Sequence, residues 1–188
     1  MRPVGPGVKL TYDDYVLFPE DGKRHELIDG EHYVTPSPGR KHQAIAWNLT
    51  VMIGSWLKQN PIGRAFAAPF DVVFSQFDVV EPDLLYIAGA RQDEVLTPAH
   101  VRGAPDLVVE IGSPGTRRRD ETIKRRLYER FAVAEYWVID PELYTIKVYR
   151  RSGEEYVRAA ELTIAQGASL STPLLSGLDM PLAEIFQD

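Results

Sequence analysis

The apolar residues of this chain recur with two different periods, which predict a mixture of helices and strands. Ser37-Pro38 has the form of an N-cap followed by proline, and it opens a long core helix that ends before Pro61. A shorter helix is predicted from Thr11, which with Asp14 forms a capping-box variant, and another over residues 117–131. The helical spacing of apolar residues predicts which side chains face the core: Ile45, Leu49, Met52, Ile53, Trp56 and Leu57 in the long helix, and Ile123, Leu127 and Phe131 in the last.

Strands are predicted between and after these helices. Two short segments joined by Asp29-Gly30 predict a β-hairpin over residues 25–34, because this pair suits the positive φ angles of a type I′ turn. One of the helices would form the crossover between two later strands. We therefore expect an α/β (α+β mixed) fold in a single domain over residues 1–188, with a mixed sheet flanked by helices. The further strands are predicted at residues 70–74, 81–87, 106–111, 135–139 and 144–149.

The composition is that of an ordinary globular protein, and it excludes several kinds of chemistry. No cysteine is present, which excludes disulfides, thiol catalysis and cysteine metal sites, and which fits a cytoplasmic location. The apolar runs are shorter than a membrane span, and residues 1–9 lack the apolar core of a signal peptide. We therefore expect no membrane partner.

Charge is distributed unevenly along the chain. The net charge is −6, yet residues 117–130 hold seven basic and only three acidic side chains. A local basic patch on an acidic protein suits a partner that carries phosphates, and it is equally typical of a solvated helix face.

Two Pro-Asp pairs, Pro82-Asp83 and Pro105-Asp106, each open a predicted strand. Glu110 shares a strand with Asp106, but four residues of strand separate their backbones by about 13 Å, too far to share one ion. If the two strands are neighbours, Asp83 and Glu110 can meet over one metal ion, and Asp106 is then a strand-start residue. A salt bridge to an arginine is the alternative interpretation of Glu110.

An ordered set of motifs resembles the bacterial Uma-two family of restriction endonucleases, formerly domain of unknown function eight-twenty. That family belongs to the PD-(D/E)XK nuclease superfamily. The resemblance extends from about Thr11 to Asp188. Its motifs are His25-Glu26-Leu27-Ile28-Asp29-Gly30-Glu31, Val80-Glu81-Pro82-Asp83, residues 105–111, Ser113-Pro114, residues 124–128 and residues 135–141.

The resemblance implies a restriction-endonuclease-like core in which Asp83 and Glu110 hold Mg²⁺. Gly112 stands where the superfamily has a lysine, so Lys124 on the following helix becomes the candidate for that role. Glu26 is a further acidic candidate for the catalytic site. The rival interpretations are a solvated helix residue for Lys124 and a surface carboxylate for Glu26.

Two further residues, His42 and Tyr128, have expected roles beside this site. His42, near the start of the long helix, is interpreted as a packed or capping residue rather than a catalytic base. Tyr128, four residues after Lys124 on the same helix face, is expected to orient that lysine.

These residues predict a DNA endonuclease that uses Mg²⁺, for which Mn²⁺ can substitute. Arg117, Arg118 and Arg125 are expected to bind phosphates that flank the scissile one. A homodimer is expected, since two sites would cut both strands and since the tail holds apolar residues for an interface: Leu170, Leu174, Leu175 and Leu178.

Two alternatives stay open. One is a module that keeps the nuclease fold and binds nucleic acid or protein without cutting, and it is favoured by Gly112 at the lysine position. The other is a metal hydrolase of free nucleotides, which lacks the support of a phosphate loop.

Overall fold

A six-stranded mixed sheet forms the centre of the molecule in a computed structural model that describes residues 7–113 and 115–188. Neighbouring strands are antiparallel except for β8 and β9, which run parallel and are joined by a helical crossover. The sheet has the order β11(Glu155–Thr163), β10(Thr145–Ser152), β9(Glu135–Asp140), β8(Leu107–Ile111), β6(Leu84–Ala88) and β3(Gly63–Ala67).

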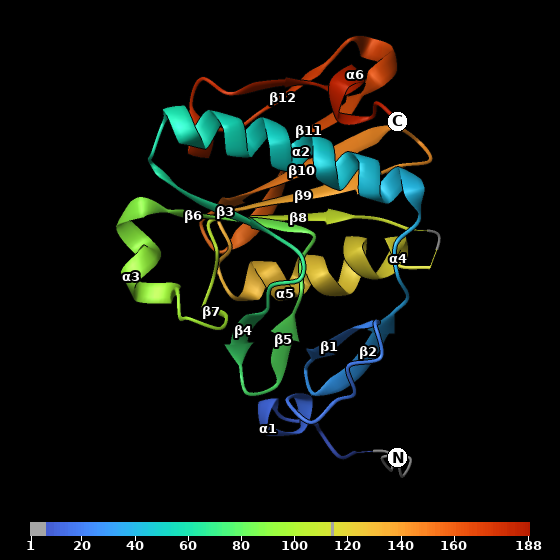
Figure 1. Ribbon diagram of the computed structural model, residues 1–188, viewed down its shortest axis with the longest axis vertical. Coiled ribbons are helices and arrows are strands. Elements are labelled where there is room, and N and C mark those ends of the chain that lie inside the picture. The colour runs from blue at the N-terminus through green and yellow to red at the C-terminus, as the bar shows by residue number, and fades with distance from the viewer. Residues whose placement is uncertain (1–6, 114) are drawn as a thin grey trace.

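Helices cover both faces of this sheet, as Figure 1 shows. Helix α2(Arg40–Gln59) packs on one face, and the helical segment α4(Arg117–Arg119), η2(Asp120–Lys124) and α5(Arg125–Arg130) packs on the other. Strand alternation divides the apolar side chains between the two faces: Leu107 and Val109 face α2, whereas Val108 faces α5. The expected mixed sheet flanked by helices is confirmed.

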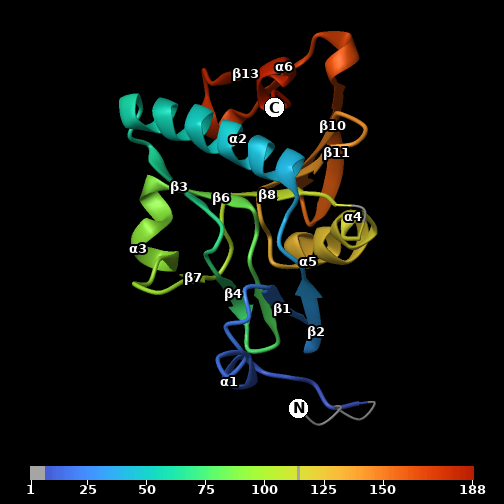
Figure 2. The ribbon, with the colours of Figure 1, turned by 45° about the vertical axis from the view of Figure 1, so that its right-hand side comes forward.

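A second sheet of five short strands extends from the α5 side (Figure 2). Its hairpin turns at Asp29 and Gly30, whose φ angles of 53° and 75° match the predicted tight turn. Helix α1(Tyr12–Tyr15) follows Thr11, which forms the expected capping box with Asp14. The sheet has the order β2(Glu31–Thr35), β1(Arg24–Ile28), β5(Asp78–Val80), β4(Val72–Ser75) and β7(Val101–Arg102).

The long helix begins later than predicted. Its first residue is Arg40 and its N-cap is Gly39, whereas Ser37 donates from Oγ to the Gly22 carbonyl at 3.3 Å and so ties the preceding linker to the β1 entry. Residues 36–39 therefore form a linker without regular secondary structure between β2 and α2.

The C-terminal tail folds back over α2 and closes the core. Leu170, Leu175 and Leu178 are buried and Leu174 packs against them, so these side chains are not available for a subunit interface. The apolar tail, which was one reason to expect a homodimer, is thus part of the monomer core. Its elements are η3(Ile164–Gln166), β12(Ser169–Ser171), η4(Pro173–Leu175), β13(Asp179–Pro181) and α6(Leu182–Ile185).

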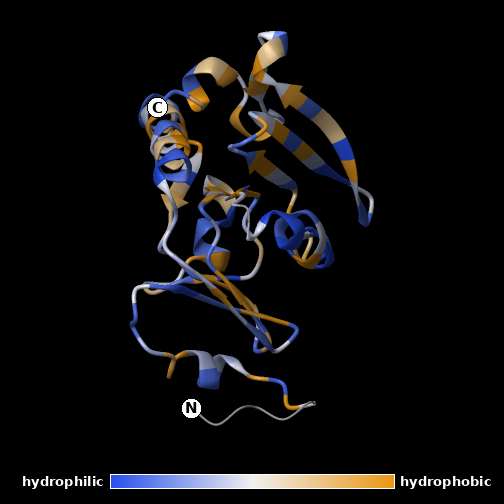
Figure 3. Ribbon diagram, turned by 90° about the vertical axis from the view of Figure 1, so that its right-hand side faces the viewer, coloured by the Kyte–Doolittle hydropathy of each residue, from blue (hydrophilic) through white to orange (hydrophobic). Residues whose placement is uncertain are grey.

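Polar and apolar residues alternate along β10 and β11, which is visible as blue and orange bands in Figure 3. The inward residues Ile146 and Val148 join the core beside α2, and the outward ones face solvent. The remaining elements are η1(Gly89–Arg91) and α3(Gln92–Val95) between β6 and β7. None of the helices in the described residues has the length and apolar character to cross a membrane.

Candidate active site

Asp83 and Glu110 come from neighbouring strands and lie side by side. The register pairs Leu84 of β6 with Val109 of β8, and the backbone N–H of Ile111 donates to Asp83 Oδ2 at 2.7 Å. Both carboxylates are buried. The structure thus brings together the two acids that the sequence singled out, as adjacent-strand geometry requires.

Asp106 lies at the opposite end of β8 from Glu110. Its carboxylate accepts from the Ala88 backbone N–H at 2.8 Å and pairs with Arg91 at 2.9 Å. The residue therefore holds the start of the strand, as expected, and is not part of the acidic pair.

Lys124 reaches the acidic pair and is completely enclosed, with 1% of its surface exposed. Its Nζ lies 2.8 Å from Glu110 Oε1 and 2.7 Å from Glu26 Oε1. Two ion pairs offset the cost of removing the ammonium group from water. The interpretation of Lys124 as a solvated helix residue is therefore wrong.

The prediction that Ile123 faces the core is also wrong, because the helix is not uniform. Residues Asp120–Lys124 form a π-helical turn, which holds more residues than an α-helical turn and rotates the faces that come before and after it. Ile123 is consequently 37% exposed, while Lys124 takes the inward position. Leu127 is buried, as expected.

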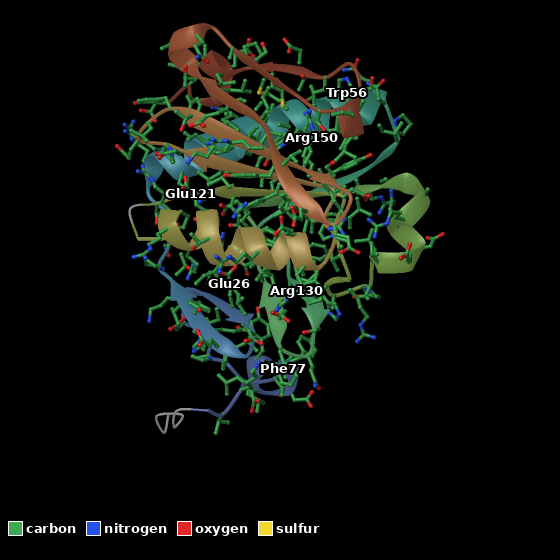
Figure 4. All side chains as sticks on the ribbon, turned by 180° about the vertical axis from the view of Figure 1, so that it is seen from behind. Glu26, Trp56, Phe77, Glu121, Arg130 and Arg150 are labelled. Atoms are coloured by element: carbon green, nitrogen blue, oxygen red, sulfur yellow. The ribbon has the colours of Figure 1, made fainter. Side chains whose placement is uncertain are left out.

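Glu26 projects from β1 into the same cluster and has no exposed surface. Figure 4 labels it between the hairpin and the α5 segment. Its Oε1 accepts from the Glu81 backbone N–H at 3.1 Å as well as from Lys124, and its Oε2 lies 3.5 Å from Arg119. The alternative of a surface carboxylate is therefore wrong.

Tyr128 binds the acid rather than the lysine. Its hydroxyl donates to Glu110 Oε1 at 2.5 Å, on the oxygen that also accepts from Lys124. Tyr128 therefore positions Glu110, and the expectation that it orients Lys124 directly is corrected.

Three cationic or titratable side chains at this site were not predicted. Arg24 binds Asp83 at 2.9 Å and Glu81 at 2.8 Å, and His42 Nε2 lies 3.2 Å from Asp83 Oδ2. His42 is thus a packed residue, as its interpretation from sequence allowed, but it packs against Asp83 in the site. Arg119 approaches Glu26, as described above.

One of the three could have been found from the sequence. Arg24 precedes Glu26 by two residues, and strand alternation puts such residues on one face. The positions of His42 and Arg119 depend on long-range packing, which no local pattern reports.

A cavity of about 430 Å³ opens over these groups. It lies between the hairpin, the 36–39 linker, the start of α2 and the α4 segment. Both acidic and basic side chains line it, so it can accept both a cation and a phosphate. Its charged and titratable lining residues are Lys23, Arg24, His42, Glu81, Asp83, Glu110, Arg119, Asp120 and Lys124.

Three buried polar atoms beside this cavity have no hydrogen-bond partner among the described residues: Glu26 Oε2, His42 Nδ1 and Arg119 Nε. Only one other such atom occurs in the described part of the chain, on His100. Buried polar groups are normally paired, so this concentration indicates a place where a ligand completes the bonding.

The predicted phosphate-binding arginines lie outside the cavity. Arg117 pairs with Asp140 at 2.5 Å beside a smaller cavity of about 240 Å³, and Arg118 is exposed. The Arg125 guanidinium lies 5.5 Å from the ring centre of Tyr149. The basic residues of this segment therefore fall into two groups. Lys124 and Arg119 lie in the site, and these three arginines lie outside it.

The surrounding charges and burial give Asp83 and Glu110 very different pKa values. Burial alone would raise the pKa of Asp83, but the hydrogen bond from His42 and the charge of Arg24 outweigh it and hold that pKa at about 2. Burial raises the pKa of Glu110 to about 8, and the nearby Asp83 adds to this effect, while Lys124 offsets part of it. Burial would lower the pKa of Lys124, but the charges of Glu110 and Glu26 raise it, so the lysine stays cationic.

Asp83 and Glu110 supply the hard oxygen ligands that Mg²⁺ prefers. Within residues 7–113 and 115–188, no three His, Asp or Glu side chains are grouped as a ready-made metal cage. Mg²⁺ commonly binds through one or two carboxylates and keeps several waters, so this pair is a sufficient donor set. Glu26 Oε2, which has no hydrogen-bond partner among the described residues, is a further oxygen beside it.

Comparison with known proteins places these residues in a family. Residues 12–183 match the Uma2 family, described as "Putative restriction endonuclease". This is the Uma-two family that the motifs resemble, so that prediction is confirmed. No curated protein is significantly similar to the chain.

Two solved structures are similar to this one. A "putative nuclease belonging to DUF820" from Anabaena variabilis ATCC 29413 superposes with a TM-score of 0.75 at 26% identity, over 94% of this chain and 97% of that chain. The type IIG restriction endonuclease BpuSI has a TM-score of 0.42 at 11% identity, over 65% of this chain and 13% of that one.

Proposed function

We propose that this chain, which belongs to the Uma2 family, is an endonuclease that hydrolyses DNA phosphodiester bonds with a divalent metal ion. The observation that carries the proposal is the convergence of Asp83, Glu110, Glu26 and Lys124 from four separate segments on one buried cluster, in which Asp83, Glu110 and Lys124 line the cavity. A cluster of buried charges is costly to fold, which favours a functional role over a purely structural one.

Asp83 and Glu110 would hold Mg²⁺, and Mn²⁺ could take its place. When bound, the metal polarises the scissile phosphate and lowers the pKa of a coordinated water. Arg24 and Lys124 balance the two carboxylates when no metal is present, since each cation lies within 3 Å of its acid. Because burial raises the pKa of Glu110, metal binding would be coupled to the loss of the proton that Glu110 holds below that pKa.

Lys124 supplies the positive charge that a phosphodiester needs as negative charge develops on its oxygens. Gly112 carries no side chain, so a cation from the helix takes the place of one from the strand. The position of Lys124 weakens the main argument for an inactive module, which was the lack of a lysine at 112. Arg119 lines the same cavity and is suited to the same phosphate.

Arg117, Arg118 and Arg125 would bind phosphates on either side of the scissile one, because they belong to the same helical segment as the cavity residues Arg119 and Lys124. The proposal that two copies cut the two strands of a duplex now rests only on the symmetry of the substrate. Light scattering at tens of micromolar tests it, and a monomeric mass on DNA and off DNA would contradict it.

The test of the proposed function is plasmid cleavage with Mg²⁺, Mn²⁺ or EDTA by the wild type and by Asp83→Asn and Glu110→Gln. Metal-dependent nicking that both variants lose is the expected result. Asp106→Asn is the matched control, since it changes the same chemical group at the far end of β8. DNA binding without cleavage under any metal would support the inactive module, and turnover of free nucleotides alone would support the nucleotide hydrolase.

A further inference from the structure

The outward face of α2 carries an exposed aromatic side chain close to the cavity. Of the three tryptophans, Trp137 is buried and Trp56, labelled in Figure 4, packs against the core, whereas Trp47 is 68% exposed. Val51, one turn further along, is 43% exposed. A tryptophan ring that faces water on a rigid helix is available to stack on a planar partner.

This exposed face is continuous with the candidate active site. Gln43 lines the cavity, and Trp47 and Val51 follow it at four-residue intervals, so the three side chains form one row. Each interval rises about 6 Å along the helix. A single DNA strand rises roughly 3.4 Å per nucleotide, so Trp47 stands about two nucleotides from the cavity rim.

The charge of α2 favours a nucleic acid. Its twenty residues contain no Asp or Glu, although 27 of the 188 residues of the chain are acidic. Its first turn carries Arg40 and Lys41, and Lys58 lies in its last turn. Arg40 and Lys41 pair with Asp188 and Glu142 at exposed positions, where such pairs exchange readily with phosphate.

A second copy of the chain fits this face less well. Trp47 and Val51 together expose only on the order of 200 Å², against roughly 800 Å² per partner in a stable interface. An antiparallel α2–α2 contact would also bring the basic ends of two helices together without an acid on either helix to pair with them.

We propose that the row Gln43, Trp47 and Val51 binds a single-stranded segment of the DNA substrate, with Trp47 stacking on an unpaired base about two nucleotides from the cavity. Stacking needs the open face of a base, which a continuous duplex does not offer, and an exposed aromatic ring is sufficient for it. The substrate class is therefore DNA with an unpaired segment beside the cut. This inference rests on the proposed function for its substrate but is tested by binding alone.

The experiment measures fluorescence anisotropy of labelled oligonucleotides in EDTA, where metal-dependent cleavage does not occur. The substrates are a single strand, a blunt duplex and a duplex with a single-stranded tail. Trp47→Ala should weaken binding of the two substrates with unpaired bases by about tenfold or more. It should change binding of the blunt duplex by less than about twofold and leave the salt dependence unchanged, since stacking neutralises no phosphate.

The matched variants are Trp47→Phe, which keeps an aromatic ring and should retain most of the affinity, and Leu17→Ala, which removes another exposed apolar side chain, beside α1, and should change nothing. Equal loss on all three substrates, or none on any, would overturn the proposal. A fall in molecular mass by light scattering in Trp47→Ala would overturn it in favour of a self-interface. These outcomes do not depend on cleavage, so they are distinct from a failure of the metal site.

Discussion

Replacing Lys124 by Met removes the ammonium group and keeps the length of the side chain. The wild-type Nζ makes ion pairs of 2.7 and 2.8 Å with two carboxylates that are almost completely buried. Breaking a buried pair on one side costs about 3–5 kcal/mol, because the remaining charge is left without compensation. Protonation of Glu110, whose pKa is already raised to about 8, relieves part of this cost at neutral pH, so we expect a value near the lower limit.

The same variant should lose at least about 100-fold in turnover, the scale of one oriented electrostatic group. Its metal affinity should be kept or increased, since Lys124 competes with the metal for Glu110. Urea unfolding and plasmid nicking below the unfolding transition measure the two effects separately. Arg126→Ala is the control, since it removes an exposed charge from the same helix and should change stability by less than about 0.5 kcal/mol. Normal turnover in a folded Lys124→Met would refute the role of Lys124.

Three further predictions follow from other parts of the site. Because Glu110 must lose a proton to bind metal, Mg²⁺ affinity measured by calorimetry should rise with pH up to about 8 and level off above it, and a flat profile in the wild type would contradict this. Arg118→Ala should lower the slope of DNA affinity against salt by about one phosphate contact without changing single-turnover cleavage, and an unchanged slope would remove Arg118 from the DNA surface. Ile123→Ala should cost less than about 1 kcal/mol of stability, whereas Leu127→Ala should cost about 2–5 kcal/mol, and equal costs would contradict the rotation of the helix at the π turn.

The acidic pair could be predicted because its determinants are local. Asp83 follows a proline at the start of one apolar strand, and Glu110 lies near the end of another, so strand spacing alone separates them from Asp106. The hairpin at Asp29-Gly30 was predictable for a similar reason, since few residue pairs accept two positive φ angles.

The burial of Lys124 could not be predicted from periodicity. A count of 3.6 residues per turn makes Ile123 the inward residue, and only a π turn exchanges its position with that of Lys124. That turn is stabilised by ion pairs to Glu26 and Glu110, which are distant in the sequence. The spacing of residues along one helix cannot predict ion pairs with other elements.

Contacts between distant parts of the chain also explain why the packing of the tail and the position of His42 were not predicted. The apolar residues of the tail were predictable as buried, but not that α2 of the same chain would cover them. His42 lies on a helix whose start the sequence placed too early, and its contact with Asp83 exists only once α2 packs over the end of β8.

The central claim is that Asp83 and Glu110 together hold the catalytic metal. Anomalous diffraction from crystals soaked in Mn²⁺ tests it most directly, with Asp83→Asn crystals treated in the same way as the control. The account predicts one strong peak coordinated by carboxylate oxygens of both residues, and its loss in the variant. A peak at another place, or none at a Mn²⁺ concentration that supports cleavage, would contradict the account.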